Sequence, residues 1–244
     1  MTVLLLACTR AVPPTPDPEP EPIAPPRVVG FAADPRHTGV SPGSIGTDLA
    51  VAWKAPVGVQ GWHSSPLVVG DRVVVGSYGE TWNTCDPQDG VYVVARDTGR
   101  VALFVATGCD ANGVSSDGSH LYAVTDAGNV VAMGLDGTRV FETRAHDGKL
   151  YAAPSVLPQG LLVSGSGGFL ALLDPATGGL RKRLPATGSI RNHSVLDGRV
   201  AYGTEENGVQ ICMLDGSGCV GWQSSGDRSP IYGAPAMDGN DVAV

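Results

Sequence analysis

Four cysteines in the body of the chain are spaced so that oxidation to disulfides is the chemistry open to them. Cys212 and Cys219 flank a segment centred on Asp215-Gly216, a dipeptide typical of two-residue hairpin turns. With that turn at the tip, Cys212 stands directly opposite Cys219, and directly opposed residues lie about 4.5–5.5 Å apart. A disulfide can bridge Cα atoms at that separation. We therefore expect a Cys212–Cys219 bridge across the hairpin.

The other two cysteines are farther apart in the sequence. Cys85 stands in a long loop between two expected strands, and Cys109 stands where the chain leaves the same four-stranded unit. We expect these two to pair, and four cysteines formally permit three pairings. Disulfides persist in oxidising compartments, so two bridges favour a secreted or cell-envelope protein over a cytosolic one.

A second group of residues is suited to binding. Polar and aromatic side chains recur just before a series of short apolar strands, and such side chains can hydrogen-bond a sugar, a peptide or ordered water. If those strands line a central channel, these side chains face it. The candidate channel residues are His63, Ser64, Asn112, Tyr151, Arg191, Asn192 and Tyr232. Their alternative role is to satisfy buried backbone groups and hold channel water.

The sequence offers no motif for catalysis or for a metal ion. The five histidines are spread through the chain, and no two of them have the spacing of metal ligands. We therefore expect neither a catalytic residue nor a metal site, and we expect the protein not to be an enzyme.

The composition predicts an all-β protein. The chain of 244 residues contains 34 Gly and 19 Pro, and only 16% of its residues are charged. Apolar residues come in short runs broken by Gly, Asp, Asn and Pro, and no apolar stripe of helical period is sustained. The net charge of −8, with scattered Lys and Arg, argues against nucleic acid as a partner.

The chain repeats itself about every 40 residues. One landmark is the first apolar residue of the strand after each Gly/Asp turn, at Val73, Leu121, Leu161, Val200 and Val242. A second landmark is the Asp of the next turn, at Asp97, Asp136, Asp174 and Asp215. Both series share a period near 40, which is the length of a four-stranded propeller blade.

Each unit is expected to contain four short antiparallel strands, which gives four complete blades and about half of a fifth within residues 31–244. An additional strand is expected at Leu49–Lys54, where it would complete the last blade of a closed ring. We interpret the chain as the front piece of a ring of six to eight blades. A five-bladed ring lacking one strand is the alternative.

Two of the turns carry a family resemblance. The segments 95–100 (Ala-Arg-Asp-Thr-Gly-Arg) and 171–178 (Ala-Leu-Leu-Asp-Pro-Ala-Thr-Gly) resemble the repeat of the pyrroloquinoline-quinone-type (PQQ-like) β-propellers. In that repeat an aromatic residue follows the turn and packs between adjacent blades. The resemblance implies this docking role for Trp53, Phe104, Phe141 and Trp222, with Leu184 replacing the aromatic in one unit.

The resemblance implies a fold more firmly than a function, because the same blades serve different proteins. They build quinoprotein dehydrogenases and also non-catalytic scaffolds such as the outer-membrane assembly factor BamB. The dehydrogenases carry an adjacent Cys-Cys pair and a calcium site, and no two cysteines are adjacent here. We therefore expect no PQQ or calcium and a non-catalytic scaffold that binds envelope proteins. A quinoprotein dehydrogenase fragment and a secreted carbohydrate- or ligand-binding propeller are the alternatives.

The front of the chain predicts how such a protein is held at a membrane. Leu5-Leu6-Ala7-Cys8 resembles the bacterial lipobox, which implies that residues 1–8 belong to a signal peptide and that Cys8 is lipidated. Residues 9–30 are rich in Pro and Glu and are expected to form an extended, disordered tether. Together they predict a lipid-anchored protein of the outer membrane or periplasm, with secretion as the alternative.

Overall fold

The computed structural model describes residues 36, 49–62, 64–206, 208–223, 230–239 and 241–243 of the chain. All the secondary-structure elements in these ranges are β-strands. Among the described residues, no helix is long and apolar enough to cross a membrane. His63, Cys8, the lipobox and the 9–30 tether lie outside the described residues, so the expectations for them stay predictions.

Four antiparallel sheets of four strands each follow one another along the chain, and a two-stranded sheet comes last. The first sheet contains β1 (Leu67–Val69), β2 (Arg72–Tyr78), β3 (Asp89–Ala95) and β4 (Val101–Ala106). The second contains β5 (Ala111–Ser116), β6 (His120–Thr125), β7 (Asn129–Gly134) and β8 (Arg139–Arg144). The third contains β9 (Ser155–Leu157), β10 (Gly160–Gly165), β11 (Phe169–Leu173) and β12 (Leu180–Arg183). The fourth contains β13 (Ile190–Leu196), β14 (Arg199–Thr204), β15 (Gly208–Met213) and β16 (Cys219–Gln223), and the last pair is β17 (Ala236–Asp238) and β18 (Asp241–Ala243).

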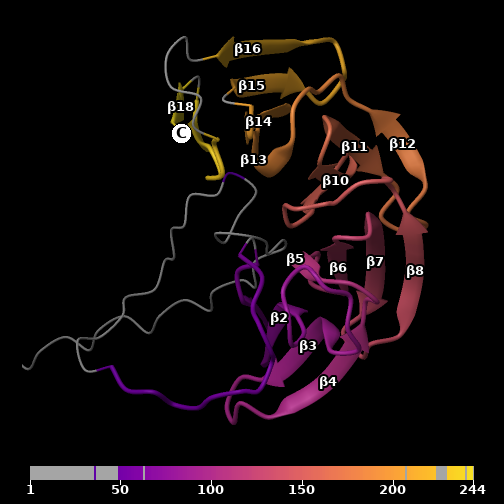
Figure 1. Cartoon of the computed structure of the whole chain (residues 1–244), viewed down its shortest axis with the longest axis vertical. Helices are drawn as coiled ribbons and strands as arrows, with labels where there is room; N and C mark the ends of the chain where they lie inside the picture. The colour runs from indigo at the N-terminus through magenta and orange to yellow at the C-terminus, as the bar shows by residue number, and fades with distance from the viewer. Residues whose placement is uncertain are drawn as a thin grey trace, which may run out of the picture.

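The sheets are arranged as the blades of a propeller. They follow an arc in which the last strands, β4, β8, β12 and β16, lie at the outer rim and β5 and β13 lie nearer the centre (Figure 1). The expected fold class, four complete four-stranded blades and part of a fifth, is confirmed. One expected strand is wrong: Leu49–Lys54 forms no β-strand, because it has no strand beside it to complete its hydrogen bonds.

The hydrophobic core lies between the blades. Successive residues of a strand point to opposite faces of its sheet, so the buried second strand β6 serves two interfaces. Leu121 and Ala123 pack with the first blade, whereas Tyr122 and Val124 pack with the third. A third cluster joins the third blade to the fourth. Blades buried on both faces explain why their inner strands are continuous apolar runs rather than alternating ones.

The turn at Asp174 joins the third and fourth strands of its blade and shows how neighbouring blades are fitted together. The Asp174 carboxylate accepts hydrogen bonds from the backbone N–H groups of Ala176 at 2.8 Å and Thr177 at 3.0 Å. Gly178 then adopts φ +72°, and a Cβ at that residue would stand 2.6 Å from the Phe141 ring of the preceding blade. Glycine is therefore required at Gly178 both by the backbone conformation and by the ring packed on it.

The four residues expected to dock between blades have different outcomes. Trp53 and Phe141 each pack on the turn glycine of the next blade. Phe104 does not: it pairs with Tyr92 across the sheet and the two rings lie 4.6 Å apart, while Leu103 packs on Gly137 instead. The expectation for Phe104 was wrong because neighbouring residues of a strand face opposite sides. Trp222 is 62% exposed on β16 and its docking stays a prediction.

Candidate functional site

Both expected disulfides are present. Cys212 pairs with Cys219 in the register of β15 and β16, with a Cα–Cα distance of 4.0 Å. Cys85 pairs with Cys109 at a Cα–Cα distance of 4.2 Å. The second bridge fastens the long loop between β2 and β3 to the segment that enters the next blade, and this segment leads to the cavity of the molecule.

A cavity of about 410 Å³ opens where the inner ends of the successive blades meet. Its wall takes residues from five consecutive units: the segment before β1, the β2–β3 loop, β5, the segment before β9, β13 and the segment before β17. The lining residues are Trp62, Tyr78, Trp82, Asn112, Asp126, Lys149, Tyr151, Arg191 and Tyr232. Such a mixture of aromatic surface and a few convergent polar groups is typical of ligand sites.

Four of the candidate channel residues line this cavity, namely Asn112, Tyr151, Arg191 and Tyr232. Two others do not. Ser64 is buried, and its hydroxyl accepts a hydrogen bond from the Gly76 N–H at 3.3 Å. Asn192 is also buried, and its side-chain amide donates to the Tyr232 carbonyl at 3.0 Å. These two residues join segments of the fold, which is the alternative role that the sequence left open.

Five residues that line the cavity were not among the candidates predicted from the sequence. Trp62 and Trp82 stack with their ring centroids 5.3 Å apart, although 20 residues separate them. Tyr78 ends β2, Asp126 directly follows β6, and Lys149 lies in the segment between β8 and β9; the repeat brings these three positions together at the inner ends of the blades. Marking the residues after every second strand, as well as those before every first strand, would have found Asp126.

The tryptophan pair offers open aromatic surface. Trp62 is 75% exposed and Trp82 is 54% exposed, so neither ring is part of the core. Tyr78, at the end of β2, is buried, and its hydroxyl accepts a hydrogen bond from the Trp62 N–H at 3.2 Å. Burial raises the pKa of Tyr78 to about 12, so the phenol stays neutral at physiological pH. The exposed rings are therefore available to a ligand.

Arg191 is held in the cavity wall by two aromatic rings and a carboxylate. Its guanidinium carbon lies 3.8 Å from the ring centroid of Tyr151 and 5.7 Å from that of Tyr232. Its Nε donates to the Glu205 carboxylate at 2.6 Å. Cation–π contact and ion pairing together hold the guanidinium in place in the cavity wall.

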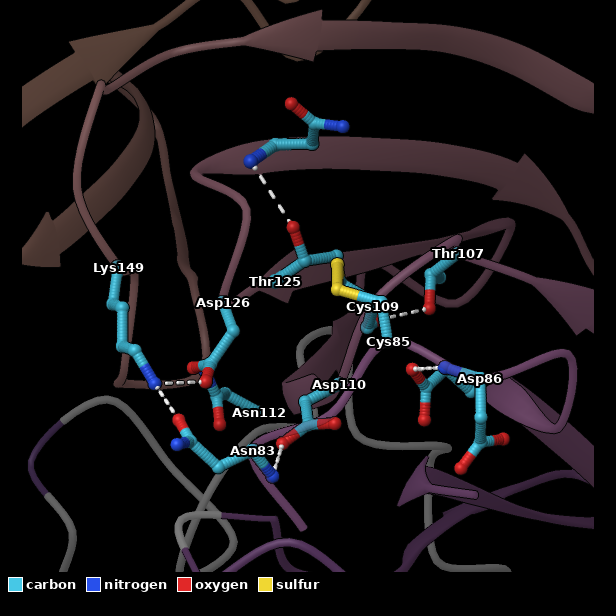
Figure 2. Close-up of a disulfide and its surroundings, with 12 residues drawn as sticks. Asn83, Cys85, Asp86, Thr107, Cys109, Asp110, Asn112, Thr125, Asp126 and Lys149 are labelled. Atoms are coloured by element: carbon cyan, nitrogen blue, oxygen red, sulfur yellow. Dashed lines mark hydrogen bonds and ion pairs between the residues drawn. A yellow bond between two sulfur atoms is a disulfide. The ribbon is translucent and has the colours of Figure 1, made fainter. Parts of the chain in front are cut away.

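A polar cluster stands beside the aromatic part of the cavity. The Asp126 carboxylate accepts a hydrogen bond from the Asn112 amide at 2.6 Å and forms an ion pair with Lys149. The Lys149 ammonium also donates to the Asn83 side-chain oxygen (Figure 2). The same Asn112 amide donates to the Leu150 carbonyl at 2.7 Å, so the cluster is tied to the next blade. Its charges are compensated within the cluster.

Two buried carboxylates support the loop behind this cluster. Asp110 accepts a hydrogen bond from the Asn83 N–H at 2.7 Å (Figure 2). Asp89 accepts one from the Asp86 N–H at 2.8 Å. Burial raises the pKa of Asp110, and burial followed by the nearby negative charge of Asp110 and Asp86 raises the pKa of Asp89 to about 6. Asp86 itself receives three further backbone N–H groups of the loop.

The described residues offer no site that fits the calcium ion that the resemblance brings with it in dehydrogenases. Among them no group of three or more His, Cys, Asp or Glu side chains is arranged to hold a metal ion. The Lys149 ammonium already occupies the space between the oxygens of Asp126 and Asn83. The four cysteines of the described ranges form the two disulfides, and none is adjacent to another.

A serine–histidine contact lies elsewhere and is closed to solvent. His193 stands between the hydroxyls of Ser155 at 3.0 Å and Ser164 at 2.9 Å. His193 and Ser164 are fully buried and Ser155 is 5% exposed. No substrate can reach the pair in this conformation, so it stabilises the packing of the third blade on the fourth.

Comparison with known proteins supports the fold. The crystal structure of a computationally designed protein, Ika8, is similar to this chain, with a TM-score of 0.58 and 14% sequence identity. The match covers 70% of this chain and 51% of the designed one, so the chain spans about half the length of that structure. No model of a protein family and no curated protein matches the sequence. The likeness therefore establishes the arrangement of blades and leaves the function to the site.

Proposed function

We propose that this protein is a non-catalytic binding module of the cell envelope and that it takes its ligand at the cavity where the inner blade ends meet. The observation that carries the proposal is the cavity of about 410 Å³, in which open aromatic surface and compensated polar groups from five units converge. Because five units contribute to the site, its shape depends on how the blades are spaced. Packing of the blades on one another holds the site rigid, and a rigid site loses less entropy when a ligand binds.

The envelope part of the proposal draws on the cysteines. Two disulfides are typical of a protein that folds in an oxidising compartment. The lipobox-like sequence at Cys8 and the Pro/Glu-rich tether over 9–30 would hold such a domain away from a membrane. Envelope proteins remain proposed partners, with the blade rims as their contact surface.

Thermal unfolding against a panel of ligand classes tests the binding proposal. The panel contains saccharides, amino acids, short peptides, nucleosides and polyamines. A ligand at 100 times its dissociation constant stabilises the folded state by about 2.7 kcal/mol, which raises the melting temperature of a domain of this size by about 5–10 °C. We expect at least one class to produce such a shift in the wild type and to lose it in Trp82→Ala.

Two results would contradict the proposal. The first is a panel in which no class shifts the melting temperature. The second is dye-linked oxidation of an alcohol or sugar after addition of PQQ and calcium, since this would make the protein an enzyme. Trp222→Ala provides the matched control, because Trp222 is also an exposed tryptophan but lies on β16, outside the cavity.

A further inference from the structure

We propose that the cavity binds a neutral saccharide of one or two rings. The inference rests on the proposed binding function and assigns the chemical class of its ligand. Three properties of the cavity support it: flat aromatic faces open to the cavity, polar groups that both donate and accept, and charges that are already compensated within the wall.

The aromatic faces match the shape of a sugar ring. Trp62, Trp82 and Tyr232 are each more than half exposed and line the same cavity. One face of a pyranose presents several C–H groups with a slight positive charge, and the face of an aromatic ring is negative. The two surfaces therefore pack flat on each other without requiring a charge on the ligand.

The polar groups match the hydroxyls around the edge of that ring. A hydroxyl donates one hydrogen bond and accepts others, so it needs donors and acceptors side by side. Asp126 supplies carboxylate acceptors, and the ammonium of Lys149 and the guanidinium of Arg191 supply donors. A vicinal diol can therefore bond to both members of an ion pair without separating them.

The charge balance argues against a charged ligand. Lys149 is paired with Asp126, and Arg191 is paired with Glu205. All four side chains are less than 40% exposed, so an anion that drew away a cation would leave a partly buried carboxylate uncompensated. An additional cation would meet the same positive charges. A neutral polyol avoids both costs.

The volume limits the ligand to a small one. About 410 Å³ is near the lower end of the range of roughly 300–1,000 Å³ typical of ligand pockets. Trp82 of the β2–β3 loop and Tyr232 of the segment before β17 both line this space. One or two sugar rings fit this space, and further rings of a longer chain would extend into solvent.

Calorimetric titration with matched sugars tests the inference. The neutral probes are glucose, N-acetylglucosamine, maltose and cellobiose, and the charged probes are glucuronic acid and glucosamine. We expect at least one neutral sugar to bind and the charged sugar of the same ring to bind more weakly. Trp82→Ala and Tyr232→Ala should each weaken binding about tenfold, which corresponds to about 1.4 kcal/mol, while Trp222→Ala should leave it unchanged.

The possible outcomes separate this inference from the proposed function. If only a charged sugar or a non-saccharide class binds, and Trp82→Ala abolishes that binding, the binding module stands and the neutral saccharide is refuted. If no class binds, both are refuted. Circular dichroism of each variant establishes that it is folded, and Trp82→Phe, which keeps an aromatic face, should restore most of the affinity.

Discussion

Gly99 has no side chain because the Trp53 ring occupies the place where a Cβ would stand, 2.7 Å away. Gly99→Ala would therefore introduce a clash in addition to the strain of its positive φ. Gly108 has a similar φ of +77° but open space around it, so Gly108→Ala carries the strain alone. We expect urea unfolding to show Gly99→Ala less stable than Gly108→Ala by about 1–3 kcal/mol. Equal losses would contradict the docking role of Trp53.

The docking residues also show what can be predicted from residue types. Trp53 and Phe141 were expected because the resemblance to the PQQ-like repeat implies a docking aromatic near each turn, and the structure places both on glycines. Leu103 could not be predicted from its type, because the choice between Leu103 and Phe104 depends on the register of β3 with β4. A bulge between Val93 and Val94 shifts that register by a residue, and nothing in the sequence marks it.

Asp89 gives the fold a pH dependence. Burial and then the charge of its neighbours Asp110, Asp86 and Asp126 raise the pKa of Asp89 from 3.8 to about 6, against the backbone N–H of Asp86 that lowers it. The folded state therefore binds the proton more tightly than the unfolded state, so stability rises as the pH falls from about 7 towards 4.5 and is lowest above pH 6.

Unfolding in urea at several pH values measures this effect. We expect Asp89→Asn to be more stable than the wild type at pH 7 by about 1–3 kcal/mol and to depend less on pH between 5 and 7, because the amide is neutral throughout. The raised pKa of Asp110 leaves a residual slope in the same direction. Asp97→Asn, at an exposed turn, is the control and should follow the wild type. A steeper slope in Asp89→Asn would contradict the assignment.

At the scale of an element, the β2–β3 loop links oxidation state to the cavity. The loop carries Trp82 and Asn83 to the site and is fastened by the Cys85–Cys109 disulfide. Removing that bridge with Cys85→Ser/Cys109→Ser frees a closed segment of 24 residues, which destabilises the fold by about 3 kcal/mol. We expect hydrogen exchange to accelerate over 80–88 and ligand affinity to fall several-fold.

The second disulfide provides the comparison. Cys212→Ser/Cys219→Ser removes a bridge of only seven residues within one hairpin, outside the cavity, so binding should be unchanged. If Cys85→Ser/Cys109→Ser leaves the rate of hydrogen exchange over 80–88 unchanged, the hydrogen bonds of Asp86 and Asp110 hold the loop without the disulfide. That result would contradict the role given to the disulfide.

The same loop shows which elements sequence reasoning can reach. Strands and turns were predicted because local apolar runs and Gly/Asp turns define them. The landmark residues Val73, Leu121, Leu161, Val200 and Val242 each lie in the second strand of their unit, as expected. The stacking of Trp62 on Trp82 was missed because it joins the segment before β1 to the β2–β3 loop. The β2–β3 loop has no counterpart of similar length in the other blades, so this contact could not be inferred from the repeat.

At the scale of the whole molecule, each blade has a core with its immediate neighbours and with no other blade in the described arc. Proteins built in this way have stabilities that approximate a sum of unit and nearest-neighbour contributions. The cavity is the exception, because Trp62 and Tyr232 belong to the first and the last described units and line the same space. The function proposed here therefore depends on the assembled arc, while stability depends on adjacent pairs.

Leu161→Ala tests that distinction. Leu161 is fully buried in the cluster between the second and third blades, and truncating it removes about 2–5 kcal/mol of stability. If the stability of each blade depends only on its immediate neighbours, hydrogen exchange should accelerate over the second and third blades, β5–β12. It should accelerate much less over β1–β3 of the first blade. Leu180→Ala, at a 65% exposed position on β12, should change neither the stability nor the hydrogen exchange of the blades. An equal loss of protection in every blade would show instead that the arc unfolds as one cooperative unit, in which the cavity and the cores are stabilised together.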